Sequence, residues 1–219
     1  MAAVSAPSGP PETLSGRERI LSAAAQRFLD AGYVETSLRD LAADVGMKAG
    51  SMYYHFESKD ALLIAVLERG MSLMVDAFEE VVDGFAVAGV DNAIESAADQ
   101  RLAAHITAHL RALHDNRAFT AGHVTLFRTA PQVVREAVLP LRDGYEARWT
   151  ALLAEVLPDR SIDERTMLRL GLFGAMNASI EWLDTGRGTV DRFARLVADQ
   201  FWRGVGSEPS EESSGKGKR

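Results

Sequence analysis

The chain of 219 residues is 47% hydrophobic and 25% charged, with a formal net charge of −7. This composition is that of a globular protein of one or two domains, and the absence of cysteine excludes disulfide bonds, thiolate metal ligands and cysteine nucleophiles. No apolar run approaches the roughly 20 residues that span a bilayer, and the N-terminus shows no signal-peptide pattern. We therefore expect a cytoplasmic protein with no membrane partner.

The N-terminal segment predicts a short arm followed by a helix. Residues 1–14 are rich in Ala, Ser, Gly and Pro, which is typical of a disordered arm. Ser15 and Glu18 have the spacing of a capping box, in which each residue satisfies a backbone N–H of the other. Apolar residues then recur at helical spacing from Ile20 up to Gly32, so a first helix is expected there.

The stretch 37–56 predicts two short helices that meet at a tight turn. Ser37 is placed to cap the first helix, and Gly46 to end it, because glycine adopts the left-handed conformation at little cost. The second helix directs outward a set of donors and aromatic rings rather than solubilising charge. In a helix-turn-helix, such a second helix enters the major groove of DNA.

The rest of the chain predicts further helices and no strands, so the expected fold class is all-α. Ser58 is expected to cap a long helix reaching Val82, and the glycine-containing segment 84–90 is interpreted as a loop. Further helices are expected over 91–116, 117–129, 132–157 (broken or kinked near Pro140), 163–183 and 189–206. The Ser/Gly/Glu/Lys-rich residues 207–219 are expected to form a disordered tail.

Several motifs resemble the TetR family of transcriptional regulators over roughly residues 15 to 67. They are Thr36-Ser37, Leu41-Ala42, Val45-Gly46, the run 51–56 (Ser-Met-Tyr-Tyr-His-Phe) and the run 58–62 (Ser-Lys-Asp-Ala-Leu). The C-terminal pattern Gly-Ala-Met-Asn, then Trp182, then Gly-Arg-Gly is also similar to the end of such chains. The resemblance implies a DNA-binding domain at 15–60 with its motif at 37–56, and a ligand-binding and dimerisation domain at 61–206. It also implies a homodimer formed through the last two helices.

The resemblance further implies which residues face DNA. They are Ser37, Arg39, Lys48, Ala49, Gly50, Ser51, Tyr53, Tyr54, His55 and Lys59. Arg39 is suited to reading a guanine, with an ion pair to Asp40 or Glu35 as the alternative. The small Ala49 and Gly50 favour backbone contacts and readout of DNA shape. Residues 1–60 carry six Lys/Arg against eight Asp/Glu, so we expect weak nonspecific binding to DNA.

The histidines and aromatics of the larger domain admit three interpretations: core packing, a metal site or a ligand cavity. His105 and His109 share a helix face, but no Asp or Glu lies at matching spacing, which disfavours a metal. In the family the equivalent helices surround an apolar cavity with a few polar anchors. The residues expected to line it are His105, His109, Phe119, His123, Phe127, Arg128, Tyr145, Trp149, Phe173 and Asn177.

The sequence offers no support for catalysis or for a resident cofactor. It has no phosphate-binding loop after a strand, no nucleophile elbow and no His-Glu-x-x-His motif, so we expect no enzyme. We predict a repressor that binds a palindromic double-stranded DNA operator as a dimer and is released by a small hydrophobic or acyl-CoA-type effector. A metal-responsive or ligand-independent DNA-binding protein is the alternative.

Overall fold

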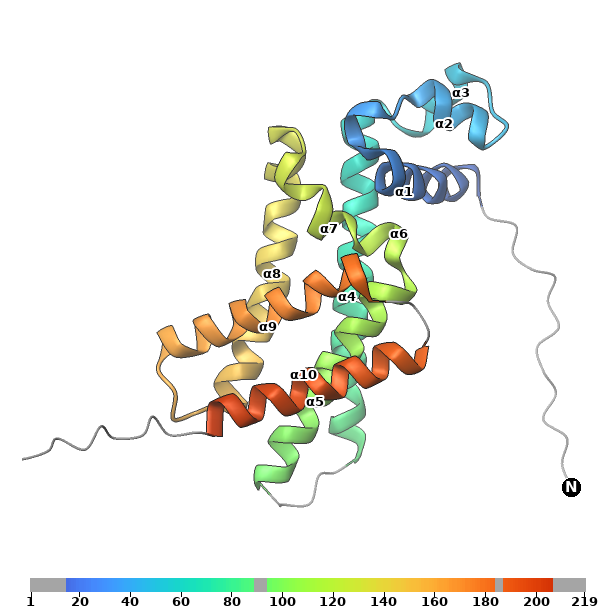
Figure 1. Ribbon diagram of the computed structural model, residues 1–219. Helices are drawn as coiled ribbons and strands as arrows, with labels where there is room; N and C mark the ends of the chain where they lie inside the picture. The colour runs from blue at the N-terminus through green and yellow to red at the C-terminus, as the bar shows by residue number, and fades with distance from the viewer. Residues whose placement is uncertain (1–14, 89–93, 184–186, 207–219) are drawn as a thin grey trace, which may run out of the picture.

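The computed structural model describes residues 15–88, 94–183 and 187–206, and these form helices without any strand (Figure 1). The prediction of an all-α fold is confirmed. In chain order the elements are α1 (Gly16–Glu35), α2 (Leu38–Asp44), α3 (Ala49–His55), α4 (Lys59–Ala88), α5 (Ile94–Asp115), α6 (Arg117–Thr120), α7 (Gly122–Thr125), the 3-10 helix η1 (Phe127–Thr129), α8 (Gln132–Val156), α9 (Ile162–Trp182) and α10 (Arg187–Gly206). The arm and tail predicted at 1–14 and 207–219 lie outside the described residues.

Helices α1, α2 and α3 gather at one end of the molecule (Figure 1). The capping box at Ser15 and Glu18 is present, and Ser37 accepts the N–H of Asp40. Gly46 has φ +68°, the left-handed conformation expected where α2 ends. Gly32 has φ +85° and interrupts α1, which resumes for one short turn and ends at Glu35. The predicted boundaries of the helix pair are thus confirmed.

Helix α4 joins this end of the molecule to the rest. Ser58 caps it, accepting the N–H of Ala61, and its first half packs in one core with α1 and α3, while its second half packs in the core of the larger bundle. The smaller core extends past residue 60 to Leu67 and takes in Val134 and Val138 from α8. The loop prediction for 84–90 is wrong for residues 84–88, which continue α4. A single glycine weakens a helix by about 1 kcal/mol but does not end it.

The larger bundle contains the remaining helices, packed around the fully buried Trp149 of α8. Helix α8 runs through Pro140 without a break. Proline has no N–H to donate to the carbonyl of Glu136, and both residues are exposed to solvent. Water can satisfy that carbonyl, so the proline is tolerated.

The single helix predicted over 117–129 is instead three short pieces, α6, α7 and η1. Helix α9 starts earlier than predicted, because Ser161 and Glu164 form a capping box.

Among the described residues, no helix is both long enough and apolar enough to cross a membrane.

Candidate DNA-binding and ligand-binding sites

The outer face of α3 carries exposed aromatic side chains. Met52 and Phe56 are buried against α1 and α4, and this fixes the rotation of the helix. Tyr53 and Tyr54 point away from the core and are 62% and 88% exposed. Two large aromatic rings at such exposure, without an apolar neighbourhood, are suited to contacting a partner such as the DNA backbone.

The other residues predicted to face DNA surround this helix. Ser37, Lys48, Ala49, Gly50 and Ser51 are exposed. A Cβ added at Gly50 would meet no atom within 4 Å, so the backbone is open to close approach by a partner.

Arg39 and His55 have different environments. Arg39 is exposed and, within the described residues, has no carboxylate at ion-pair distance. The alternative partner Asp40 instead interacts with Ser37, whose hydroxyl lies 2.6 Å from its carboxylate and lowers the pKa of that group. His55 is half-buried, with its ring close to Gly16 at the start of α1. Arg39 thus remains available for DNA, whereas His55 also serves the packing of the domain.

Lys59 is already engaged within the protein. Its ammonium group donates to the carbonyl oxygens of Tyr33 and Thr36, both at 2.9 Å, and lies 4.1 Å from the centre of the Tyr33 ring. These contacts close the C-terminal end of α1 onto the start of α4. The structure therefore gives Lys59 a structural function that the sequence did not suggest.

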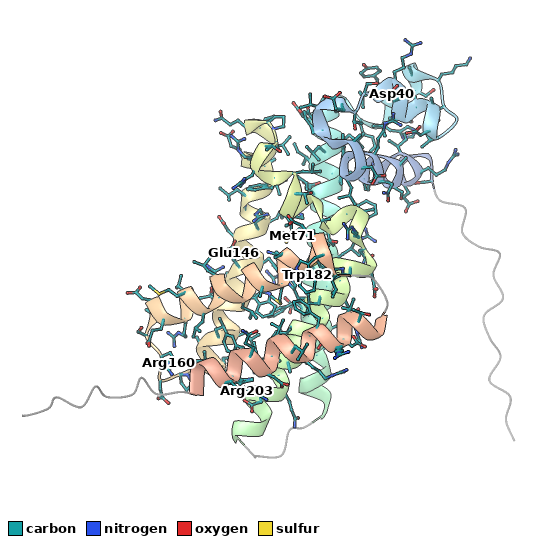
Figure 2. The ribbon with its side chains drawn as sticks, viewed as in Figure 1. Asp40, Met71, Glu146, Arg160, Trp182 and Arg203 are labelled. Atoms are coloured by element: carbon teal, nitrogen blue, oxygen red, sulfur yellow. The ribbon has the colours of Figure 1, made fainter. Side chains whose placement is uncertain are left out.

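A cavity of about 60 Å³ lies inside the larger domain. Figure 2 shows two of its lining residues, Met71 on α4 and Glu146 on α8, in the middle of the molecule, far from Asp40 in the DNA-binding domain. The lining residues are Met71, Met74, His109, Leu113, Thr120, His123, Val124, Arg142, Tyr145, Glu146, Phe173 and Asn177. The cavity thus combines an apolar wall with a few polar side chains, as small-molecule sites do.

Five of the ten residues predicted to bind a ligand line this cavity: His109, His123, Tyr145, Phe173 and Asn177. His105 and Trp149 lie behind the wall: His105 packs edge-on against Phe78, with 4.2 Å between ring centres, and Trp149 packs against His109.

The remaining three predicted residues lie elsewhere. Phe119 and Phe127 pack against the smaller core, and Arg128 is exposed in η1. The sequence also missed Arg142 and Glu146. Both lie on the same face of α8 as Tyr145 and Trp149, at spacings of three and four residues. This spacing could have indicated from the sequence that they face the cavity.

His109 and Tyr145 form a buried polar pair in the cavity wall. The Tyr145 hydroxyl lies 2.9 Å from Nδ1 of His109. Burial lowers the pKa of His109 to about 4, the dominant effect, although the neighbouring Asn177 amide acts in the opposite direction. Burial also raises the pKa of the Tyr145 hydroxyl. At neutral pH both groups are uncharged, and Nε2 of His109 lies near the Asn177 amide without a partner at hydrogen-bond geometry.

The segment containing α6 and α7 connects the cavity to α4. His123 lines the cavity and donates from Nε2 to the carbonyl of Leu67, at 2.7 Å. Nearby, a Cβ added at Gly70 would lie 2.4 Å from the carbonyl oxygen of Phe119, so α6 is packed directly on the α4 backbone. Leu67 belongs to the core of the DNA-binding end. A displacement in the cavity can therefore reach that core through few contacts.

The outer surfaces of α9 and α10 carry exposed apolar side chains. Met167, Leu170, Trp182 and Leu196 are between 56% and 71% exposed. Between Leu170 and Trp182, the exposed positions of α9 are largely small, with Gly171, Gly174, Ala175 and Ala178. Small residues beside large apolar ones suit close packing against another helix.

A search of the described residues for three clustered His, Cys, Asp or Glu side chains that could hold a metal ion finds none.

Comparison with known proteins identifies the class. The model of "Bacterial regulatory proteins, tetR family" matches residues 20–66, and that of the "Tetracyclin repressor-like, C-terminal domain" matches residues 95–205. The fold and the outward helix pair are those of a DNA-binding transcriptional regulator, a class of protein that is not enzymatic. The chain belongs to the TetR family, as its motifs predicted.

Individual relatives match it over different lengths. The transcriptional repressor KstR2 of Mycolicibacterium smegmatis is 33% identical over 78 residues, which is 36% of this chain and only 38% of KstR2. The transcriptional activator FasR of the same organism is 26% identical over 88% of this chain and 84% of FasR. The structure of AibR in complex with isovaleryl coenzyme A and operator DNA superposes with a TM-score of 0.70 at 20% identity, covering 84% of this chain and 96% of AibR. At that identity the likeness shows the fold alone.

Proposed function

We propose that this protein is a repressor that binds a palindromic operator as a homodimer and leaves it when a small molecule occupies the cavity. The observation that carries the proposal is the short route from the cavity to α4, through the hydrogen bond from His123 to Leu67. A ligand that moves His123 shifts α4 and with it the helix pair. Half-sites in such operators lie about 34–36 Å apart, so a shift of a few ångströms is sufficient to lose register.

DNA binding is proposed to use the exposed face around α3. Replacing Arg39 or Tyr53 by alanine is expected to weaken operator binding roughly tenfold to a hundredfold, because each loses a contact to a base edge or a phosphate. Fluorescence anisotropy with a labelled operator measures this. Arg101→Ala, on α5 and remote from α3 (Figure 1), removes the same charge and is the matched control. Unchanged affinity in both α3-side variants would contradict the proposed face.

The homodimer is proposed to form through α9 and α10. Leu196 lies with Trp182 and Phe193 in a groove beside the end of α9. Replacing Leu196 by arginine is expected to raise the dimer dissociation constant roughly a hundredfold, because a charge would enter an apolar interface. Val133→Arg on α8, also an exposed apolar position, is the control and should leave the dimer intact. Analytical ultracentrifugation distinguishes the two; a dimer that withstands Leu196→Arg would place the interface elsewhere.

The direction of regulation and the effector class are proposed more broadly. KstR2 is a repressor and FasR an activator, so the direction of regulation needs its own test. If this protein is a repressor, the expression of a reporter gene behind the operator rises when the protein is deleted. A small hydrophobic or acyl-CoA-type effector suits the partly apolar cavity, and AibR was solved with an acyl-CoA. Release of the operator that needs a metal ion would favour a metal-responsive regulator. Operator binding that no ligand changes would favour a ligand-independent DNA-binding protein.

A further inference from the structure

Arg142 is a half-buried cation in the cavity without a carboxylate partner. It donates from one terminal nitrogen to the carbonyl of His123, at 2.8 Å, and its guanidinium carbon lies 4.3 Å from the centre of the Phe127 ring. Within the part of the chain that the structure describes, no carboxylate lies at ion-pair distance from it. Burial lowers the pKa of Arg142, although the more distant carboxylates of Glu146 and Asp143 act in the opposite direction.

The acidic residue of the same wall makes its ion pair with another arginine. Glu146 lies one turn after Arg142, but its carboxylate pairs with Arg169 of α9 at 2.5 Å. The two histidines of the cavity add no charge, because burial lowers the pKa of both His109 and His123 to about 4. Arg142 therefore makes no direct ion pair, and its guanidinium can still take an anion from the cavity.

A second donor points to the same kind of ligand. The Tyr145 hydroxyl lies 2.9 Å from Nδ1 of His109. When this hydroxyl donates its proton to Nδ1, the imidazole proton lies on Nε2. Nε2 is buried beside the Asn177 amide and has no partner within hydrogen-bond geometry. The cavity thus presents this N–H and the Arg142 guanidinium to an oxygen-rich group.

Resting on the proposed function of the cavity, we propose that its ligand is a compact organic acid, with the carboxylate bound by Arg142 and by the Nε2–H of His109. The apolar body of the acid packs against Met71, Met74 and Phe173. The cavity is small, about 60 Å³, which favours a compact acid.

The test is isothermal titration of the full-length protein with benzoate, phenylacetate and hexanoate, each beside its primary amide and its coenzyme A thioester. At least one acid is expected to bind, and its amide to bind at least roughly tenfold more weakly. Arg142→Met should weaken binding of that acid roughly tenfold to a hundredfold. Arg148→Met removes the same charge from the same helix outside the cavity and should bind as the wild type does. If Arg142→Met fails to fold, Arg142→Lys replaces it in the test. It keeps the charge and should therefore still bind the acid more tightly than the amide.

Several results would overturn the assignment: amides that bind as tightly as acids, acids that Arg142→Met binds unchanged, no acid that binds, or thioesters as the only ligands. Operator binding, measured separately by anisotropy, keeps the two proposals apart. Release of the operator by a neutral ligand alone contradicts the acid and leaves the repressor standing. An acid that binds through Arg142 without releasing the operator supports the acid and contradicts ligand-controlled release.

Discussion

Lowering the pH from 7 to 5 is expected to reduce the free energy of unfolding by about 6 kcal/mol. Burial lowers the folded-state pKa of His105, His109 and His123 from 6.5 to about 4. The unfolded chain therefore takes up these protons first as the pH falls. The stabilisation is complete above pH 6.5 and is lost between there and about pH 4, at a cost of about 2 kcal/mol per histidine by pH 5.

Urea unfolding at pH 7 and pH 5, at one protein concentration, measures this loss. Stopping at pH 5 avoids most of the range in which carboxylates protonate. His105→Leu removes one of the three groups and should reduce the difference between the two pH values by about 2 kcal/mol. Ile106→Val, a buried position without a titrating group on the same helix, is the control and should leave the difference unchanged. Equal free energies at both pH values would show that these histidines are not buried as neutral groups.

Replacing Gly70 by alanine is expected to cost about 3 kcal/mol of stability and to disturb the link between the cavity and the DNA-binding end. The added Cβ would lie 2.4 Å from the carbonyl oxygen of Phe119 and 2.9 Å from its carbon. Both are backbone atoms that cannot rotate away, so α6 must move off α4. We expect the operator affinity, or its response to the ligand, to change together with stability.

Gly84→Ala is the matched control for this substitution. Gly84 lies on the same helix, and an added Cβ there would meet no atom within 4 Å. The control is expected to be neutral or to stabilise by up to about 1 kcal/mol, through helix propensity. Thermal or urea unfolding of both variants gives the comparison. A stable Gly70→Ala variant with wild-type ligand response would show that this contact is not part of the route.

Much of the fold could be predicted because its boundaries follow from local chemistry. Ser15, Ser37 and Ser58 cap helices, and Gly46 makes a turn, whatever packs around them. The predictions failed where packing against other helices determines where a helix begins and ends. Helix α4 continues past Gly84, and the segment 117–129 breaks into short turns that pack closely on α4 at Gly70 and Leu67. A sequence pattern does not reveal such contacts.

The candidate sites were predictable to different extents. The outward face of α3 follows from the burial of Met52 and Phe56, but its contacts with DNA stay predictions. In the cavity, the sequence singled out aromatic residues and histidines, whereas it did not indicate Arg142 and Glu146. Whether a charged residue faces solvent or a cavity depends on how α8 is rotated in the bundle. Only the position of Tyr145 and Trp149 on the same face indicated it.

Titration of the purified protein onto DNA from its own upstream region tests whether α3 and its symmetry mate bind one palindromic operator. The expected result is saturable binding by a dimer to a palindrome. The affinity should fall only modestly with salt, because residues 1–60 carry no excess of positive charge. Binding that is equally strong to unrelated DNA, or absent, would show that this protein does not recognise such an operator.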